Sequence, residues 1–244
     1  MKIRAMTYNI HKGFCYYSRQ YVLEKLRDSL HEVNADVVFL QEVMGVHPEL
    51  EDQFEISSQF EFLADSVWPH FSYGKNAVYS SGNHGNAILS KFPVEDYSNL
   101  NISTNRFEKR GLLHTKLNID QKVLHLFCLH FDLRETGRVQ QLQTLMSELS
   151  LKVGENDPVI VAGDFNDWRQ KLSEELILKM NFSEIGLATF GHHLKTFPAW
   201  WPFWSMDRMY ARNLEINSAQ VLKEKKWRQL SDHLPLLAEF TILA

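Results

Sequence analysis

Apolar residues along this chain occur either in short unbroken runs or at helical spacing, and the two patterns alternate. Val22, Leu26 and Leu30 share one face of a helix, whereas runs rich in β-branched residues are typical of strands buried on both faces. These patterns predict strand 3–10, helix 19–33, strands 36–43, 86–90, 111–117 and 123–129, helix 135–151, and strands 158–162 and 234–242. A strand–helix–strand unit is therefore predicted twice.

The repeated unit predicts an α/β fold. Many short strands with few helices are typical of two packed sheets that carry their helices on the outside. In each unit the first strand runs into a polar residue, Asn9 or His130, and the second ends at a carboxylate, Glu42 or Asp164. If a pseudo-twofold axis relates the units, these four residues meet at one rim. Coincidence is the alternative, because buried strands commonly end in polar residues.

The composition is that of an ordinary globular protein. Of 244 residues, 44% are hydrophobic and 23% are charged, which excludes disordered and fibrous classes. No Gly/Ser-rich linker or charge run divides the chain, so we expect one domain over residues 1–244. The formal net charge of −4 lacks the basic excess typical of proteins that track a nucleic-acid backbone.

The cysteines and the apolar segments bear on location. Cys15 and Cys128 are too few for a disulfide framework, and we interpret both as free thiols in a reducing compartment. The N-terminus lacks a signal-peptide core, and no segment approaches the roughly 20 apolar residues of a membrane span. We expect a cytoplasmic protein. Peripheral membrane contact stays open, and nothing points to an obligate protein partner.

Three acidic residues stand where chemistry is plausible. Asp164, in Gly-Asp-Phe-Asn, precedes Asn166 by two positions, so carboxylate and carboxamide can hold a hard cation or a water together. A strand-end turn is an equal alternative. Asp232 precedes His233 at a strand entry, a pair that fits either metal and phosphate binding or a surface turn. Asp207 has apolar neighbours and needs a partner, which a histidine or the adjoining arginine can supply.

Other candidates are less specific on their own. Glu42 closes an apolar strand and either faces water or binds a cation. His130 is more commonly a core histidine bonded to a carbonyl than a catalytic one. Arg110 and Arg138 are candidates for contact with substrate phosphate, against the default of a solvated surface.

Eight short motifs together are more specific than any one of them. In chain order they are residues 7–11, 38–43, 85–91, 109–111, 129–130, 163–166, 206–208 and 231–233. Over residues 3–240 this series resembles the endonuclease/exonuclease/phosphatase family of deoxyribonuclease-like phosphoesterases, in a compact bacterial branch. The resemblance implies a four-layer α/β sandwich: two packed mixed sheets with outer helices and pseudo-twofold halves.

The resemblance also implies a reaction, the hydrolysis of a phosphate ester by water with help from a divalent cation. Glu42 would be the principal metal ligand, with Asn9 beside it and Asp232 contributing directly or through water. Oxygen ligands suit Mg²⁺ or Mn²⁺, and the lack of clustered Cys or His ligands argues against a dedicated zinc site.

The remaining family motifs imply catalytic roles. Asp164 would orient and deprotonate the attacking water, and Asn166 would position it. His233, held by Asp207, would present an imidazolium to the phosphate. At His130 the branches differ: apurinic endonucleases carry tyrosine there, whereas pancreatic-type deoxyribonucleases and the sphingomyelinase-like branch carry histidine. This chain therefore departs from the DNA-repair pattern.

Two rival classes are less compatible with the sequence. Calcineurin-like metallophosphoesterases use Gly-Asp and Gly-Asn-His motifs, but here these occur in reversed order and without an N-terminal Asp-x-His. A binding scaffold on a dead phosphoesterase fold would lose catalytic residues, and here the set is complete.

The substrate is not fixed by these motifs. Residues 195–204 contain five aromatics and two prolines, and this stiff loop precedes Asp207 by only a few positions. We expect Trp200, Trp201 or Trp204 to be exposed and to contact substrate, with Trp201 as the leading candidate; the alternative is a buried roof of the core. The expected exposure of this aromatic loop, the net charge of −4 and the histidine at position 130 together favour a phosphodiesterase that acts on a phospholipid headgroup or a small diester. A DNA or RNA nuclease is the alternative.

Overall fold

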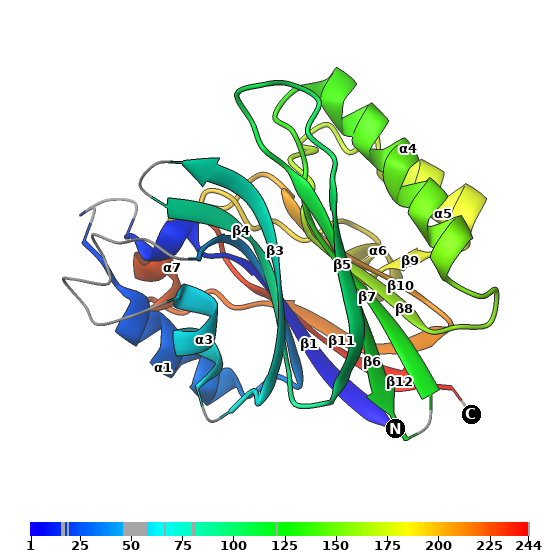
Figure 1. Cartoon of the computed structure of the whole chain (residues 1–244), viewed down its shortest axis with the longest axis horizontal. Helices are drawn as coiled ribbons and strands as arrows, with labels where there is room; N and C mark the ends of the chain where they lie inside the picture. The colour runs from blue at the N-terminus through cyan, green and yellow to red at the C-terminus, as the bar shows by residue number, and fades with distance from the viewer. Residues whose placement is uncertain are drawn as a thin grey trace.

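Two six-stranded mixed sheets pack face to face, with helices covering their outer faces (Figure 1). This computed structural model describes residues 1–15, 18, 20–45, 58–65, 67–79, 82–120 and 122–243. The N- and C-termini lie near each other at one end of the sandwich, where Ile242 N donates to Met1 O over 2.9 Å. The four-layer α/β sandwich expected from the sequence is confirmed.

The first sheet has the order β11-β12-β1-β2-β4-β3. Its strands are β1 (Lys2–Asn9), β2 (Val37–Met44), β3 (His70–Tyr79), β4 (Gly82–Ser90), β11 (Leu214–Val221) and β12 (Leu236–Ile242). The central strands β1 and β2 are parallel, and every other pairing in this sheet is antiparallel.

The second sheet repeats that arrangement in the order β5-β6-β7-β8-β10-β9. Its strands are β5 (Val94–Asn101), β6 (Gly111–Ile119), β7 (Lys122–His130), β8 (Val159–Asp164), β9 (Ser183–Glu184) and β10 (Asp207–Arg212). Here β7 and β8 form the parallel pair, flanked by antiparallel neighbours. The two sheets thus have the same pattern about their centres, as the pseudo-twofold prediction requires.

Helices flank both sheets. They are α1 (Leu23–Val33), α3 (Gln59–Ala64), α4 (Glu135–Lys152), α5 (Ser173–Met180), α6 (Ile185–Phe190) and α7 (Trp227–Leu230), with a 3₁₀ turn η1 (His11–Gly13). In Figure 1, α1, α3 and α7 lie outside the first sheet, and α4 and α5 lie outside the second.

Three apolar cores separate the four layers. Along β1, Ile3 and Ala5 enter the core between the sheets, while Met6 and Tyr8 enter the core under α1. A third core joins the second sheet to α4 and α5, for example at Leu145. Strands buried on both faces explain the unbroken apolar runs in the sequence.

Several element boundaries differ from the predictions: β4, for example, begins at Gly82 rather than at position 86, and the starts of α1 and β12 have identifiable causes. Helix α1 begins at Leu23 rather than at position 19, which lies outside the described residues. Tyr21 forms an isolated β-bridge with Phe14, and Val22 N donates to Gly13 O, so this stretch is held extended. Strand β12 begins at Leu236, because Leu234 N donates instead to Thr196 O.

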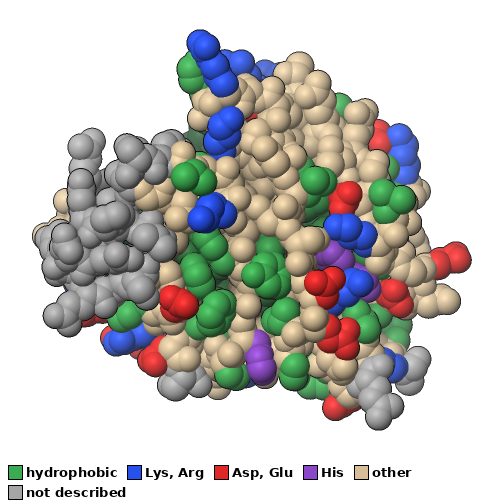
Figure 2. Space-filling model, in the orientation of Figure 1, with side chains coloured by type: hydrophobic (Ala, Val, Ile, Leu, Met, Phe, Trp, Pro, Cys, Tyr) green, Lys and Arg blue, Asp and Glu red, His purple; other side chains and the backbone are tan. Residues whose placement is uncertain are grey.

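Cys15 and Cys128 are both buried, and they form no disulfide with each other, as expected. Among the helices of the described ranges, none combines the length and apolar character needed to cross a bilayer. On the face of the molecule drawn in Figure 2, hydrophobic side chains lie among charged and other polar ones.

Candidate active site

Polar side chains converge where the central strands of the two sheets end. Parallel pairing of β7 with β8 sets His130 beside Asp164, and antiparallel pairing of β8 with β10 sets Asp164 beside Asp207. From the other sheet, Asn9 at the end of β1 donates through Nδ2 to Asp164 Oδ2 at 3.2 Å and to Glu42 Oε1 at 3.4 Å. The polar strand ends therefore meet at one rim, as the repeated unit predicts.

Asp164 lies at the centre of this cluster. Its Oδ2 atom is 3.4 Å from His130 Nε2 and 3.7 Å from His233 Nε2, and its Oδ1 atom accepts from Asn166 N at 2.9 Å. Burial raises the pKa of Asp164 to about 6, although the positive charge of His233 opposes that shift. The carboxyl group is thus close to its titration point at neutral pH.

Asp207 and His233 form a buried pair. His233 Nδ1 lies 2.8 Å from Asp207 Oδ2. Burial opposes protonation of the ring, but Asp207 and Asp164 outweigh it and raise the pKa of His233 to about 10. The sequence allows two partners for Asp207, a histidine or the adjoining Arg208. It pairs with His233, whereas Arg208 pairs with Asp167 at 3.1 Å.

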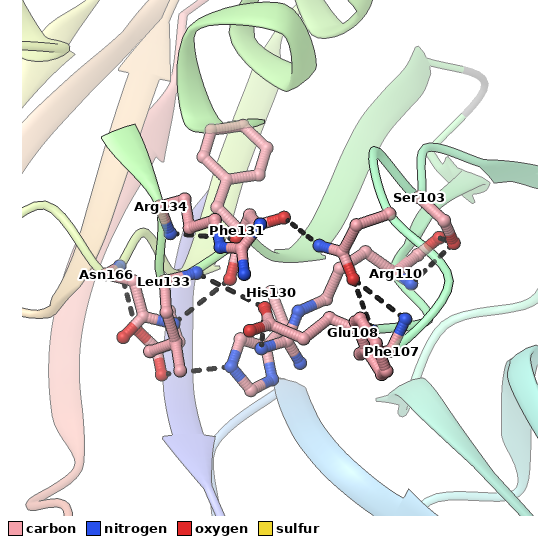
Figure 3. Close-up of polar contacts among 12 residues, drawn as sticks. Ser103, Phe107, Glu108, Arg110, His130, Phe131, Leu133, Arg134 and Asn166 are labelled. Atoms are coloured by element: carbon pink, nitrogen blue, oxygen red, sulfur yellow. Dashed lines mark hydrogen bonds and ion pairs between the residues drawn. The ribbon is translucent and has the colours of Figure 1, made fainter. Parts of the chain in front are cut away.

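His130 is in the opposite electrostatic state. Burial lowers its pKa well below the ordinary histidine value, and the charge of Arg110 adds to that effect. In Figure 3, His130 lies between Asn166 and the pair formed by Glu108 and Arg110. The neutral ring therefore faces Asp164 as a hydrogen-bonding group, not as a cation.

Glu42 owes its position to a backbone irregularity. The register between β2 and β4 shifts between Leu40 and Val43, and Glu42 inside that bulge has a φ of 57°. Bulges re-aim side chains, and a left-handed non-glycine residue costs about 1–3 kcal/mol that the surrounding structure must offset. The bulge thus turns a half-buried carboxylate of an otherwise buried strand toward the cluster.

The oxygen atoms of Asn9, Glu42 and Asp232 fit a hard divalent cation. Ser231 Oγ joins two of these residues, because it lies 2.7 Å from Asn9 O and 3.3 Å from Asp232 Oδ1. Asn9 Oδ1 accepts from His11 N at 3.1 Å, which leaves a second lone pair. Among the residues that the structure describes, no Lys or Arg forms an ion pair with Glu42. The negative charge of the half-buried Glu42 carboxylate is therefore left for a metal cation to neutralise.

A second group of ligand-type atoms has a different explanation. Atoms of Asp164, Asp207 and His233 lie within 4.8 Å of one another, a spacing that could hold a metal ion. However, Asp207 occupies His233 Nδ1, and the raised pKa keeps the ring protonated, so it has no lone pair to offer. This trio is a hydrogen-bonded acid–imidazolium array.

The two arginine candidates separate in the structure. Arg110 borders the cluster, where its Nη2 atom lies 3.3 Å from Glu108 Oε2 and its charge acts on His130. Arg138 is buried; it donates to Leu133 O at 2.6 Å, and its guanidinium lies 4.6 Å from the Trp168 ring centre. Because these contacts hold Arg138 within the protein, we correct its expected contact with substrate to a packing role.

The aromatic loop adjoins the cluster and is exposed. Phe197 packs on the His233 ring at 4.8 Å, and Ala199 N donates to Asp232 O at 2.7 Å. Trp200 and Trp201 keep 55% and 67% of their surface exposed, and Trp204 keeps 40%. The exposure expected for this loop is confirmed.

The structure also brings His84 close enough to Glu42 and His130 for their charges to interact, although its position in the sequence indicates no role. Burial lowers the pKa of His84, while the Glu42 carboxylate acts in the other direction. His84 in turn contributes to the lowered pKa of His130. Its one sequence signal is its place two residues before Asn86, inside the strand that pairs with β2.

Comparisons with known proteins show the family to which the chain belongs. A model of the Endonuclease/Exonuclease/phosphatase family matches residues 6–233. The chain belongs to the endonuclease/exonuclease/phosphatase family. The members of this family are hydrolytic phosphoesterases. The chain is also similar to YbhP, an uncharacterized protein of Escherichia coli K12: they are 43% identical over 241 residues, which cover 97% of this chain and 95% of YbhP.

Solved structures of this family have the same fold. An endonuclease/exonuclease/phosphatase from Bacteroides vulgatus superposes over the whole of both chains with a TM-score of 0.77 at 19% identity. The human Nocturnin catalytic domain with bound sulfate gives 0.77 at 18% identity, covering 99% of this chain and 94% of that one. Truncated Caenorhabditis elegans TDP2 gives 0.73 at 19% identity, covering 99% and 98%. These likenesses concern the fold.

Proposed function

We propose that this protein is a divalent-metal-dependent phosphodiesterase that hydrolyses its substrate with an activated water. The observation that carries the proposal is the position of Asp164 Oδ2, which Asn9, His130 and His233 approach within 3.7 Å in a buried setting. A carboxylate with a pKa of about 6 is matched to proton transfer near neutral pH. Asp164 is therefore the candidate general base, and Asn166, whose amide nitrogen donates to Phe131 O at 3.0 Å, would help to position the water.

His233 and its partner provide charge. The imidazolium is held by Asp207 through Nδ1, so its Nε2–H is free to donate to a phosphoryl oxygen as negative charge develops there. Holding the ring in place before reaction avoids reorganisation at the transition state. Neutral His130 would orient the Asp164 carboxylate without adding a competing positive charge.

Glu42 and Asp232, with the Asn9 side-chain oxygen, would hold Mg²⁺ or Mn²⁺. The bound cation would supply positive charge for the phosphoryl oxygens of the substrate. Arg110 at the rim would add a further contact to phosphate. A cytoplasmic location accords with the absence of a disulfide between the two cysteines.

The substrate we favour is a phospholipid headgroup or another small diester. Trp200 and Trp201 support it, because they are exposed in the loop whose Phe197 packs on His233 and tryptophans favour the water–lipid interface. The net charge of −4 also favours it over nucleic acid. Nucleic acid is the second candidate, because the same rings can stack on bases.

The test compares a generic phosphodiester, bis-p-nitrophenyl phosphate, with the monoester p-nitrophenyl phosphate, each with Mg²⁺, Mn²⁺ or EDTA. We expect metal-dependent turnover of the diester that EDTA abolishes. Asp164→Asn is the inactive control, with a kcat at least about 10²-fold lower. No metal-dependent turnover of either ester would overturn the proposal in favour of a binding scaffold.

A further inference from the structure

Arg208 is a fully buried cation on the strand that carries Asp207. It occupies the position next to Asp207 on β10, opposite Gly163 of β8. Its guanidinium forms two hydrogen bonds with Asp167: Nη2 donates to Asp167 O at 2.6 Å, and Nη1 donates to Asp167 Oδ2 at 3.1 Å. A buried ion pair made with such a planar fork fixes both distance and orientation.

Asp167 ends the turn that presents the proposed general base. Asn166, just before it, has a φ of 49°, a left-handed conformation that costs about 1 kcal/mol or more and persists only when its surroundings enforce it. Asp167 supplies that enforcement. Its carbonyl also accepts from Gln170 N at 3.0 Å, and its carboxylate accepts from Leu172 N at 2.9 Å.

Behind Arg208, a polar network fixes the other side of the guanidinium. Nη1 donates to Ser173 Oγ at 2.9 Å, and the same oxygen lies 2.8 Å from Tyr210 Oη and 3.1 Å from His193 Nε2. Glu184 Oε2 lies 2.9 Å from His193 Nδ1. Serine, histidine and glutamate thus have the spacing of a nucleophilic triad.

This network is structural, not a second nucleophilic site. The Ser173 hydroxyl has one proton and two lone pairs, and its three neighbours, Arg208, Tyr210 and His193, satisfy all of them. No lone pair is left to attack a substrate. The network instead prevents the Arg208 guanidinium from rotating away from Asp167.

We propose that Arg208 is a positioning residue, which locks the turn of Asp164 and Asn166 onto the strand that carries Asp207. The inference rests on the proposed function, since it concerns the geometry of that same site. Asp207 holds the His233 ring in place, and Arg208, through Asp167, holds Asp164, which faces that ring. The strand β10 therefore sets the distance between the Asp164 carboxylate and the His233 imidazolium. A lysine at position 208 keeps the charge but cannot bond both oxygens of Asp167 in this geometry.

The first experiment separates catalysis from stability. Arg208→Lys should lower kcat for bis-p-nitrophenyl phosphate about 10²-fold, the scale of a small misplacement of a reacting group, and leave KM within about threefold. Arg212→Lys, four positions further along β10, is the matched control: it makes the same substitution and removes the guanidinium contacts to Gly154 O and to the Phe182 ring, without touching Asp167 or its network. Whatever the change in its Tm, its kcat should stay within about threefold of the wild-type value. Equal kcat losses in Arg208→Lys and Arg212→Lys would overturn the proposal.

The second experiment needs no enzymatic activity. The Asn166 N–H donates to Asp164 Oδ1, so its hydrogen exchange reports whether the turn is locked. We expect exchange at Asn166 about tenfold or more faster in Arg208→Lys, with the wild-type rate in Arg212→Lys. Unchanged exchange at Asn166 would refute the lock even if the protein hydrolyses nothing, whereas inactivity of the wild type with faster exchange in the variant would refute only the proposed function. If Arg208→Lys does not fold, Asp167→Asn, which removes the charge and keeps the carbonyl, replaces it in both experiments.

Discussion

His233 and Asp207 are joined by a 2.8 Å contact between Nδ1 and Oδ2, and both side chains are buried. The carboxylate fixes the orientation of the ring through Nδ1–H and keeps the ring charged. Asp207 therefore acts on a substrate only through His233, and the two residues should behave as one unit.

Removing either member of this pair should be about equally damaging. His233→Ala and Asp207→Asn are each expected to lower kcat by at least about 10²-fold, because both remove a preorganised positive charge. The double variant should be no slower than the worse single variant, as is usual for groups that act together. Steady-state kinetics on bis-p-nitrophenyl phosphate checks this, and additive losses would contradict the pairing.

Glu42→Ala should act on the metal requirement. Loss of the principal carboxylate ligand is expected to raise the Mg²⁺ concentration for half-maximal activity by about tenfold or more. Titration of Mg²⁺ against diester turnover measures the shift, with Glu135→Ala on the exposed side of α4 as the control. An unchanged titration curve would mean that Glu42 is not the ligand.

Acid should destabilise the protein through a buried histidine pair remote from the cluster. His114 Nε2 lies 3.0 Å from His125 Nδ1, and burial, with the neighbouring His125, lowers the pKa of His114 to about 3. The unfolded chain takes up this proton near pH 6.5, so the stability contributed by neutral His114 is complete above that pH and is lost progressively down to about pH 3.

Chemical unfolding at a series of pH values tests this linkage. His114→Gln removes the titrating ring and keeps a hydrogen-bonding group. The free energy of unfolding of the wild type, relative to that of the variant, should fall by about 1.4 kcal/mol for each pH unit below 6.5. If the free energies of unfolding of the two proteins changed in parallel with pH, His114 would be taking up its proton in the folded state as readily as in the unfolded chain, which would contradict the prediction.

The sequence was most informative where strands are central. β1, β2, β7 and β8 are apolar on both faces, so their runs stand out, and the acids at their ends could be identified from neighbouring motifs. Strands β3, β5, β9, β10 and β11 are absent from the prediction. β5 and β11 are largely exposed edge strands with polar sequences, whereas β10 is buried but contains Asp207, Arg208 and Arg212 and so lacks an unbroken apolar run. An edge strand is defined by the partner it pairs with more than by its own hydrophobicity.

Side-chain partners were less predictable than strands. Asp207 could pair with a histidine or with Arg208. The strand register sets Arg208 opposite Gly163, where its guanidinium binds Asp167, and Asp207 therefore pairs with His233. Arg138 looked like a phosphate contact, because local sequence does not reveal that Trp168 and the Leu133 carbonyl enclose it. Long-range packing determined both outcomes.

Trp201 should matter for substrate at an interface. Trp201→Ala is expected to lower turnover of a phospholipid diester in anionic vesicles about tenfold, and to reduce the tryptophan fluorescence change on vesicle addition. Leu178→Ala, which removes a still more exposed apolar side chain on α5, is the control. Efficient cleavage of single- or double-stranded DNA, with no vesicle response and no lipid turnover, would instead favour the nuclease.

The hydrogen bond from Asn9 to Asp164 crosses between the sheets, so the cation ligands and the proposed base belong to different halves of the molecule. Neither half alone contains a working set. Partial opening of the sandwich would therefore abolish turnover before any strand loses its own hydrogen bonds. Turnover should therefore report any separation of the two sheets. A compound that binds between the sheets and separates them would inhibit hydrolysis without resembling a phosphate ester.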